Sequence, residues 1–201
     1  MAMILASQSP RRRELLGQMG FSFTVRPARG EELPHPELTP AQLVEELARQ
    51  KALEVSAGAD ADDVVVAADT VVAVDGTVLG KPRDRAHAAE MLSALSGREH
   101  TVYTGVAVKR GETLLVEHEA TQVRFRPLTQ REIDLYIQTG EPMDKAGSYG
   151  IQGYGALLVE GIRGDYFNVV GLPICRLGRM LAQVGEDALA RCAQKCAEKE
   201  R

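Results

Sequence analysis

In the first half of the chain, short apolar runs alternate with segments of helical periodicity. Residues 4–6 and 21–26 predict strands. Between them, Ser9-Pro10 predicts the start of a helix, because Ser is a preferred N-cap and Pro suits the first helical position. The capping box at residues 39–42 opens a second helix. The β-branched run at residues 64–74 predicts a buried central strand, so this half favours β–α units.

The second half is typical of antiparallel hairpins joined by helices. Alternating apolar positions over residues 99–125 predict a long hairpin that turns at Arg110-Gly111. Residues 156–162 and 166–170 predict a shorter hairpin. The remaining predicted elements are a loop at 27–38, a hairpin turn at 75–76, a strand at 77–79, helices at 83–95, 129–140 and 173–184, and a glycine-rich loop at 141–155.

This order of elements predicts an α/β or α+β protein with a mixed, highly twisted sheet flanked by helices. Neither an internal repeat nor a long linker interrupts the chain. We therefore expect residues 1–184 to form a single two-lobed domain, followed by a charged C-terminal tail at residues 185–201.

Composition narrows the class of partner. The chain has 201 residues, a formal net charge of -4, 4% aromatic residues and no Trp, so it offers little for a nucleic-acid polymer to bind. No segment approaches the roughly 20 apolar residues that span a bilayer, and the N-terminus lacks the pattern of a signal peptide. Three cysteines, Cys175, Cys192 and Cys196, are poor material for a disulfide framework. We expect a soluble, cytoplasmic protein without a membrane partner.

Residues 7–13 are the first segment that could carry chemistry. Ser7, Ser9, Arg11 and Arg12 lie where a strand is expected to pass into a helix. A helix N-terminus attracts phosphate through its unpaired backbone N–H groups and its dipole, and Arg matches phosphate geometry with two parallel hydrogen bonds. The same residues also fit a capped helix with solvated arginines. The segment alone leaves both interpretations open.

Three further segments combine charge with glycine, proline or a buried strand. Asp69 lies within the most apolar strand, where a carboxylate is costly unless it is paired or bound to a metal. Lys81 sits between Gly80 and Pro82 in a stiff loop that would suit a phosphate contact. Residues 140–153 join four glycines with Glu, Asp and Lys, which is typical of a loop that holds a ligand on a rigid scaffold.

Together these segments offer cations for a polyphosphate and carboxylates for Mg²⁺, with Glu31 and Glu32 as additional carboxylates. The inventory fits phosphoryl or nucleotidyl chemistry, but it does not say which bond breaks. The chain contains no P-loop, no G-x-G-x-x-G fingerprint and no G-x-S-x-G elbow. The four histidines have no zinc or triad spacing and are interpreted as surface residues: His35, His87, His100 and His118.

At these segments the chain strongly resembles the Maf family of nucleotide pyrophosphatases. The matching stretches follow the family's order and spacing from about residue 4 to residue 184. They are SQSPRR at 7–12, AADT at 67–70, GKP at 80–82, GREHTVYTGVAV at 97–108, GEPMDKAGSYGIQG at 140–153 and NVVGLP at 168–173. The resemblance implies a fold like that of inosine-triphosphate pyrophosphatases, with a deep cleft between two lobes. It also implies attack of water on the α-phosphorus of a nucleoside triphosphate, with release of pyrophosphate.

The resemblance also implies roles for individual residues. Asp69 would be the catalytic base or a metal ligand, and Glu32 the other carboxylate that faces a divalent metal, Mg²⁺ or Mn²⁺. Lys81 and Arg12 would assist catalysis. The residues implied to bind substrate are Ser7, Ser9, Arg11, Arg12, Lys51, Lys81 and Gln152. For Lys51, the sequence pattern by itself indicates only a helix face.

Gln152 lies where the branch of the family that hydrolyses dTTP and UTP has Gln, so the resemblance favours these two substrates. Two alternatives stay open at this point. The chain could be a nucleotide-binding regulator of cell division and septum formation with little catalysis, or it could act on another phosphate compound such as a phosphosugar. A homodimer is expected from the family alone.

Overall fold

The computed structural model describes residues 2–30, 35 and 37–199, and its centre is a seven-stranded mixed sheet. The strands run in the order β2-β1-β3-β5-β6-β7, with β4 paired to β3 off this path. Their bounds are β1 Met3–Leu5, β2 Phe23–Val25, β3 Val64–Val74, β4 Thr77–Leu79, β5 Glu99–Arg110, β6 Thr113–Phe125 and β7 Val159–Arg163. The predicted mixed α/β sheet is therefore confirmed.

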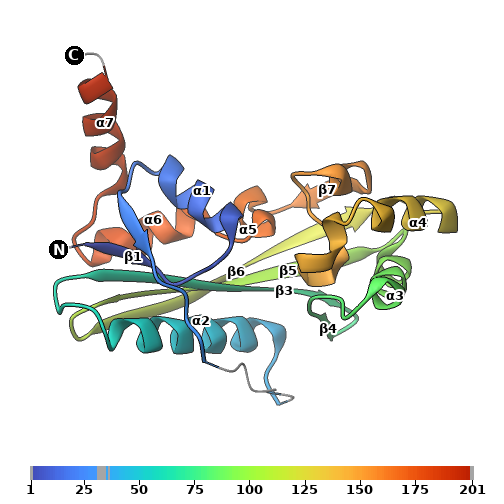
Figure 1. The fold of residues 1–201 in the computed structure, drawn as a ribbon, viewed down its shortest axis with the longest axis horizontal. Helices are drawn as coiled ribbons and strands as arrows, with labels where there is room; N and C mark the ends of the chain where they lie inside the picture. The colour runs from blue at the N-terminus through green and yellow to red at the C-terminus, as the bar shows by residue number, and fades with distance from the viewer. Residues whose placement is uncertain (1, 31–34, 36, 200–201) are drawn as a thin grey trace.

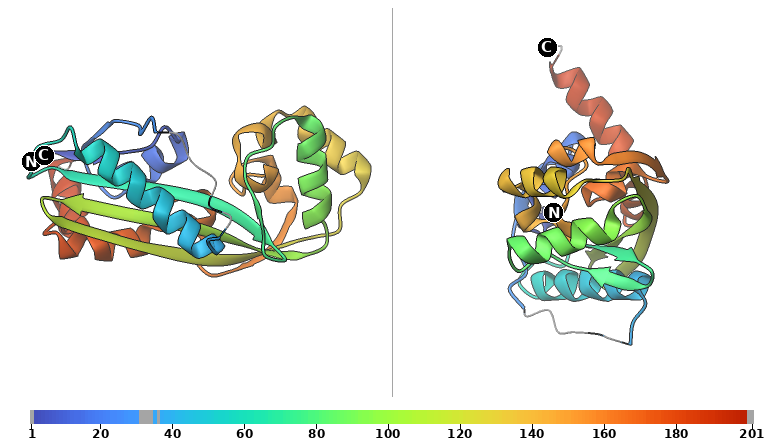
Figure 2. Two further views of the ribbon diagram at one scale, coloured as in Figure 1. Left: turned by 90° about the horizontal axis from the view of Figure 1, so that it is seen from below. Right: turned by 90° about the vertical axis from the view of Figure 1, so that its right-hand side faces the viewer.

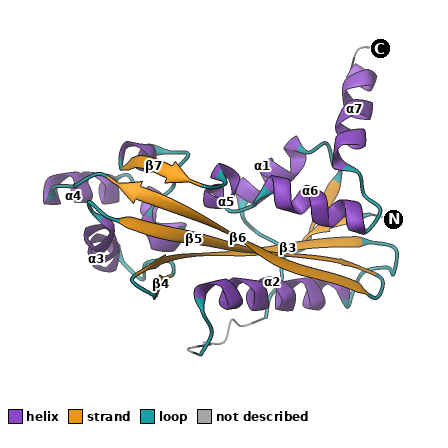
Figure 3. Ribbon diagram, turned by 180° about the vertical axis from the view of Figure 1, so that it is seen from behind, coloured by secondary structure: helices purple, strands orange, loops and turns teal. Residues whose placement is uncertain are grey.

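Helices cover the sheet in two groups, which define two lobes along the long strands β3, β5 and β6 (Figures 1 and 3). In the first lobe, α2 covers one face while α1 and α6 cover the other; in the second lobe, α3 and α4 pack at the far end (Figures 1 and 2). The helices are α1 Pro10–Gln18, α2 Pro40–Ser56, α3 Arg85–Leu95, α4 Gln130–Gln138, α5 Tyr166–Val170, α6 Ile174–Gln183 and α7 Ala188–Lys199, with short 3₁₀ turns η1 Glu141–Asp144, η2 Ala146–Ser148 and η3 Tyr154–Leu157.

The central strand β3 has a gap along one edge. On that edge, its first residues pair with β1 in parallel, and its last residues pair with β4 in antiparallel fashion. On the other edge, β5 pairs with it continuously from Val65 to Ala73. Within the described residues, no strand pairs with the gap edge between Val66 and Val72. The gap lies between the two lobes and leaves space beside Asp69 and Thr70.

Helix α2 approaches the sheet closely at one glycine. Gly105 on β5 pairs directly with Asp69 on β3. A Cβ atom at Gly105 would lie 2.0 Å from the carbonyl oxygen of Val44 in α2, so only glycine fits there. Lys51 follows Val44 by two helical turns and therefore lies on the same face of α2. This contact places Lys51 over Asp69.

Two expectations from the sequence are wrong. Residues 166–170 form helix α5 rather than the second strand of a hairpin, since Asp165 caps the helix and Asn168 is fully buried. β7 pairs instead with the end of β6. His100 is not a surface residue: it is 2% exposed and its Nε2 lies 2.9 Å from the Tyr149 hydroxyl. Burial lowers the pKa of His100 to about 4.

The tail after Gly185 forms α7, which projects from the first lobe (Figure 1). Its first turns contact the body, where the Cys192 thiol donates to the carbonyl of Met19 and Arg191 lies over the ring of Phe21. Within the described part of the chain, no helix is long and apolar enough to cross a membrane.

Candidate active site

A cleft of about 970 Å³ lies between the two lobes, a size suited to a small-molecule ligand. Its lining includes every described residue that the sequence and the resemblance single out for the site: Ser7, Ser9, Arg11, Arg12, Lys51, Asp69, Lys81 and Gln152. Glu32, the expected metal-side carboxylate, lies outside the described residues. The cleft thus gathers cations, hydroxyls and a carboxylate from segments that are distant in the sequence.

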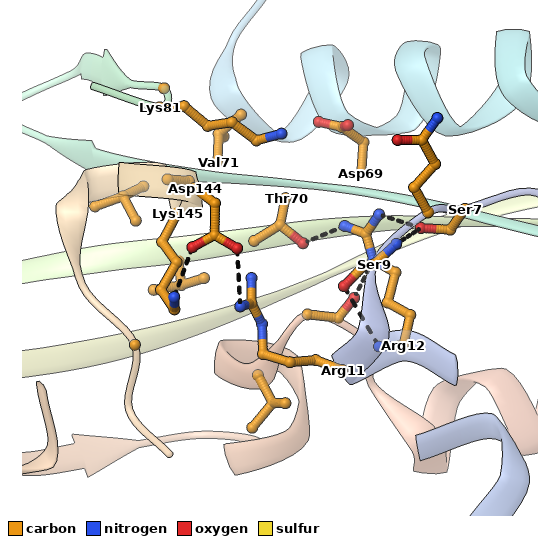
Figure 4. A pocket seen from close by; sticks show the side chains of 18 of the residues that line it. Ser7, Ser9, Arg11, Arg12, Asp69, Thr70, Val71, Lys81, Asp144 and Lys145 are labelled. Atoms are coloured by element: carbon orange, nitrogen blue, oxygen red, sulfur yellow. Dashed lines mark hydrogen bonds and ion pairs between the residues drawn. The ribbon is translucent and has the colours of Figure 1, made fainter. Parts of the chain in front are cut away.

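Arg12 links three segments around the gap in β3. Its guanidinium donates to the carbonyls of Ala68 and Gly171, both at 2.8 Å, and to the hydroxyl of Thr70 at 2.8 Å. The Ala68 carbonyl lies on the gap edge, where the backbone N–H of a neighbouring strand would otherwise donate to it. A fourth bond, 3.3 Å long, reaches the hydroxyl of Ser7 (Figure 4). Arg12 therefore has a structural role in the floor of the cleft, in addition to the phosphate contact that the resemblance implies.

The N-terminus of α1 forms one side of this floor. Ser9 caps the helix, and its hydroxyl accepts from the backbone N–H of Arg12 at 3.5 Å. The hydroxyl of Ser7 accepts from the backbone N–H of Ser9 at 3.2 Å and is almost fully buried. The positive end of the helix dipole and the two hydroxyls face the cleft together. This arrangement can bind a phosphate group.

Asp69 forms an ion pair with Lys51 on the face of β3 that α2 covers, opposite the face that α1 covers. Lys51 Nζ lies 2.5 Å from Asp69 Oδ1, and the two side chains are 19% and 13% exposed. Alternation along β3 places Asp69 on the α2 face and Thr70 on the α1 face. The hydroxyl of Thr70 lies 2.9 Å from that of Thr104, so its position is fixed as well. The floor is thus built on both faces of one strand.

The second lobe supplies a more exposed wall. Lys81 follows Gly80, whose carbonyl accepts from the backbone N–H of Gly147 at 3.0 Å. In Figure 4 the Lys81 amino group points toward the side of the cleft that holds Asp69. Asp144 lies 3.9 Å from Arg11 of the first lobe and accepts from Lys145 at 2.6 Å. Sequence reasoning named the loop at 140–153 but did not assign Asp144 and Lys145 to the site.

The cleft therefore has two walls, one from each lobe. The second-lobe wall consists of Lys81, Asp144 and Gln152, and the first-lobe wall of Ser7, Ser9, Arg11, Arg12, Lys51 and Asp69. Gln152 is exposed within the glycine-rich loop. The network around Thr70 could not be found from sequence, since its partners lie on other elements of the fold.

The described residues can be tested against a divalent metal. Across residues 2–30, 35 and 37–199, no three His, Cys, Asp or Glu side chains gather as a metal cluster. The half-buried carboxylate of Asp69 nevertheless lines the cleft. Mg²⁺ is commonly held by one or two carboxylates together with substrate phosphates rather than by an all-protein cage. The donor set therefore fits a metal that arrives with a polyphosphate.

Comparison with known proteins identifies the family of the chain. A family model described as Maf-like protein matches residues 2–184. A relative named dTTP/UTP pyrophosphatase from Moorella thermoacetica is 55% identical, covering 94% of this chain and 98% of its own length. Proteins of the same name from Symbiobacterium thermophilum and Bacillus pumilus are 56% and 52% identical, each covering 91% of this chain and 94% and 96% of their own length, respectively.

Among solved structures, a nucleoside-triphosphatase / dITP/XTP pyrophosphatase from Mycobacterium abscessus covers 92% of this chain and 98% of its own length, at 19% identity and a TM-score of 0.47. That similarity is too low to carry an argument. The family model and the relatives each match most of the chain and together identify its family. This chain belongs to the Maf family.

Proposed function

We propose that the chain hydrolyses dTTP and UTP to the nucleoside monophosphate and pyrophosphate. The observation that carries the proposal is the cleft, where Arg11, Lys51 and Lys81 face the same space as Asp69. Relatives at 52–56% identity, named dTTP/UTP pyrophosphatase, support the choice of substrates. In this proposal the enzyme acts in the cytoplasm as a homodimer, on free nucleotides and without a nucleic-acid polymer or a membrane.

In this proposal the first-lobe wall holds the reacting phosphates. The α1 N-terminus, Ser7 and Arg11 bind phosphate oxygens, while Arg12 keeps that surface in place. Lys51 orients the Asp69 carboxylate through their ion pair. Asp69 then either accepts the proton of the attacking water or holds a metal. Lys81 offers its positive charge to the departing pyrophosphate.

A divalent metal, Mg²⁺ or Mn²⁺, would neutralise phosphate charge and polarise the phosphoryl oxygens when bound. Asp69 is its proposed ligand among the described residues, and Glu32 is the second proposed ligand. We expect activity with either metal and none after addition of EDTA. Full activity in the presence of chelator would contradict this part of the proposal.

The experiment is a substrate screen with pure protein. All common nucleoside triphosphates are supplied with Mg²⁺ or Mn²⁺, and pyrophosphate is detected as phosphate after addition of an inorganic pyrophosphatase. We expect dTTP and UTP to give the highest kcat/KM. A preference for purine triphosphates would overturn the proposed substrates. Tight nucleotide binding without turnover would overturn the enzyme and favour the regulator of cell division instead.

A further inference from the structure

The carboxylate of Glu141 lies inside the glycine-rich loop that follows it in the chain. Its Oε1 accepts from the hydroxyl of Tyr136 at 2.8 Å and from the backbone N–H of Gly155 at 3.0 Å. Its Oε2 accepts from the backbone N–H of Tyr154 at 2.9 Å. The Tyr136 hydroxyl in turn accepts from the backbone N–H of Gly150 at 3.1 Å. One carboxylate therefore ties down both ends of residues 150–155.

The loop wraps so closely around this carboxylate that side chains are excluded. A Cβ atom at Gly153 would lie 2.1 Å from Glu141 Oε2. A Cβ atom at Gly155 would lie 2.5 Å from the carbonyl oxygen of Gly150 and 2.7 Å from the Tyr136 hydroxyl. These glycines are needed because of the close approach itself. The shape of the loop is thus matched to one carboxylate.

Gln152 lies between the two tied ends and lines the cleft. Outside the short η3 turn, no regular secondary structure holds residues 150–155, so these bonds fix the backbone as a strand or helix would elsewhere. Burial raises the pKa of Glu141, but bonds from Gly155, Tyr154 and Tyr136 outweigh that effect, so its pKa lies below the usual range. The carboxylate is therefore ionised at neutral pH and can accept all three bonds.

We propose that Glu141 is a positioning residue for base selectivity, acting through Gln152 by fixing the backbone that carries it. This rests on the proposed function, because selectivity for dTTP and UTP is the property that it explains. An amide that reads a base edge must be held within a fraction of an ångström to favour one base over another. Glu141 itself need not touch the nucleotide.

The test compares Glu141→Gln with Gln152→Ala and with the double variant. An amide cannot accept at both of its polar atoms, so Glu141→Gln sets an N–H group against a backbone N–H. We expect kcat/KM for dTTP and UTP to fall about tenfold, with a smaller fall for the less favoured nucleotides. In the Gln152→Ala background, Glu141→Gln should change selectivity by less than about threefold, because the two residues act as one unit.

Two controls separate positioning from general damage. Glu132→Gln alters a carboxylate that caps α4 and does not line the cleft, so it should leave selectivity unchanged. Tyr136→Phe removes one of the three donors to Glu141 and the acceptor of the Gly150 N–H, but leaves the bonds from Tyr154 and Gly155, so it should also reduce selectivity. Amide hydrogen exchange gives a readout that is independent of activity: residues 150–155 should exchange faster in Glu141→Gln than in wild type or in Glu132→Gln.

Equal losses for every nucleotide, additive effects with Gln152→Ala, or unchanged exchange at residues 150–155 would each overturn the proposal. Failure of the proposed function looks different: the wild type itself would show no preference for dTTP and UTP. The exchange measurement would then still decide whether Glu141 holds the loop.

Discussion

Side chains on the first-lobe wall are bonded to other elements, whereas those on the second-lobe wall lie on exposed loops. Arg12 and Lys51 each bridge to β3 from a helix. Lys81 and Gln152 are exposed and lie next to glycines in loops. Rigid elements place groups more accurately than loops do. The difference suggests that the first wall holds the reacting phosphate, with Lys81 added from the second wall, and that recognition of the base belongs to a loop held in place by its own local network.

The rigidity of the first wall arises from two features of the sheet. The gap beside β3 leaves backbone groups without a partner strand, and Arg12 donates a hydrogen bond to one of them, the Ala68 carbonyl. The close approach of α2 at Gly105 brings Lys51 over Asp69. The second wall has neither feature, and Glu141 replaces them with hydrogen bonds to the loop. The walls can therefore be perturbed separately.

The largest effect is expected at the first wall from Asp69→Asn. The change is nearly isosteric but removes the charge that a base or metal ligand needs. We predict a kcat loss of about 10²–10⁴ in a protein that still folds, with a lower melting temperature because the ion pair with Lys51 is lost. Steady-state kinetics with dTTP measure it, and Asp62→Asn, an exposed site ahead of the same strand, is the matched control. Near-normal turnover in Asp69→Asn would remove Asp69 from the chemistry.

A change at the helix contact should damage the same wall indirectly. In Gly105→Ala the new methyl group would meet the backbone of Val44, which cannot move as a side chain could. We predict a loss of about 3 kcal/mol in the free energy of unfolding, together with reduced kcat, because α2 carries Lys51 away from Asp69. Urea unfolding measures the loss. In Gly17→Ala, within helix α1, the new Cβ meets no atom of another element within 4 Å, so this variant should be neutral or slightly stabilised. Equal stability of the two variants would refute the contact.

Acid should weaken the core beneath the second wall. His100 is held neutral between the rings of Phe125 and Tyr149, and its pKa is lowered to about 4 by burial. In the unfolded chain His100 has its ordinary pKa of about 6.5. As the pH falls, His100 is therefore protonated in the unfolded state before it is protonated in the folded state. Stability is then lost between about pH 6.5 and pH 4, by roughly 3 kcal/mol at most.

Urea unfolding at several pH values measures this loss. His100→Gln can still form a hydrogen bond but does not titrate, so its stability should decline less over the same interval. Carboxylates contribute equally to both proteins and cancel in the comparison. Parallel curves for the two proteins would show that His100 is not the sensitive group.

The smallest effect is expected from Gln152→Glu. A neutral amide can donate and accept, which matches an adjacent donor and acceptor on uracil or thymine, whereas a carboxylate only accepts. We predict about a tenfold lower kcat/KM for dTTP, with smaller effects on other nucleotides. Gln138→Glu, an exposed position at the end of α4, is the control. If every substrate is affected equally, Gln152 has only a structural role.

Much of the fold follows from local signals in the sequence. The capping boxes at Thr39 and Thr129 form as predicted, and so do the long strands β3, β5 and β6. The prediction for residues 166–170 was wrong because aromatic and β-branched residues favour strands. The side-chain N–H groups of the buried Asn168 find their acceptors, the Val102 carbonyl and the Thr121 hydroxyl, only in the folded protein. At residues 166–170, hydrogen bonds to other elements of the fold outweighed the local preference for a strand.

The site was less accessible from sequence than the fold. Motifs indicated which residue types could bind phosphate, but the pairing of Lys51 with Asp69 depends on α2 crossing β5 at Gly105. The bonds of Glu141 join residues up to 14 positions apart in a loop without periodicity. Periodicity predicts which face of an element is buried; it cannot predict contacts made between elements.

The most direct measurement follows the oxygen of water during dTTP hydrolysis. The reaction is run with the wild-type protein and Mg²⁺ in ¹⁸O-labelled water, and the products are analysed by mass spectrometry. The account predicts dTMP and pyrophosphate in equal amounts, with the label in dTMP, because water attacks the α-phosphorus. Label in pyrophosphate, or accumulation of dTDP with free phosphate, would contradict it.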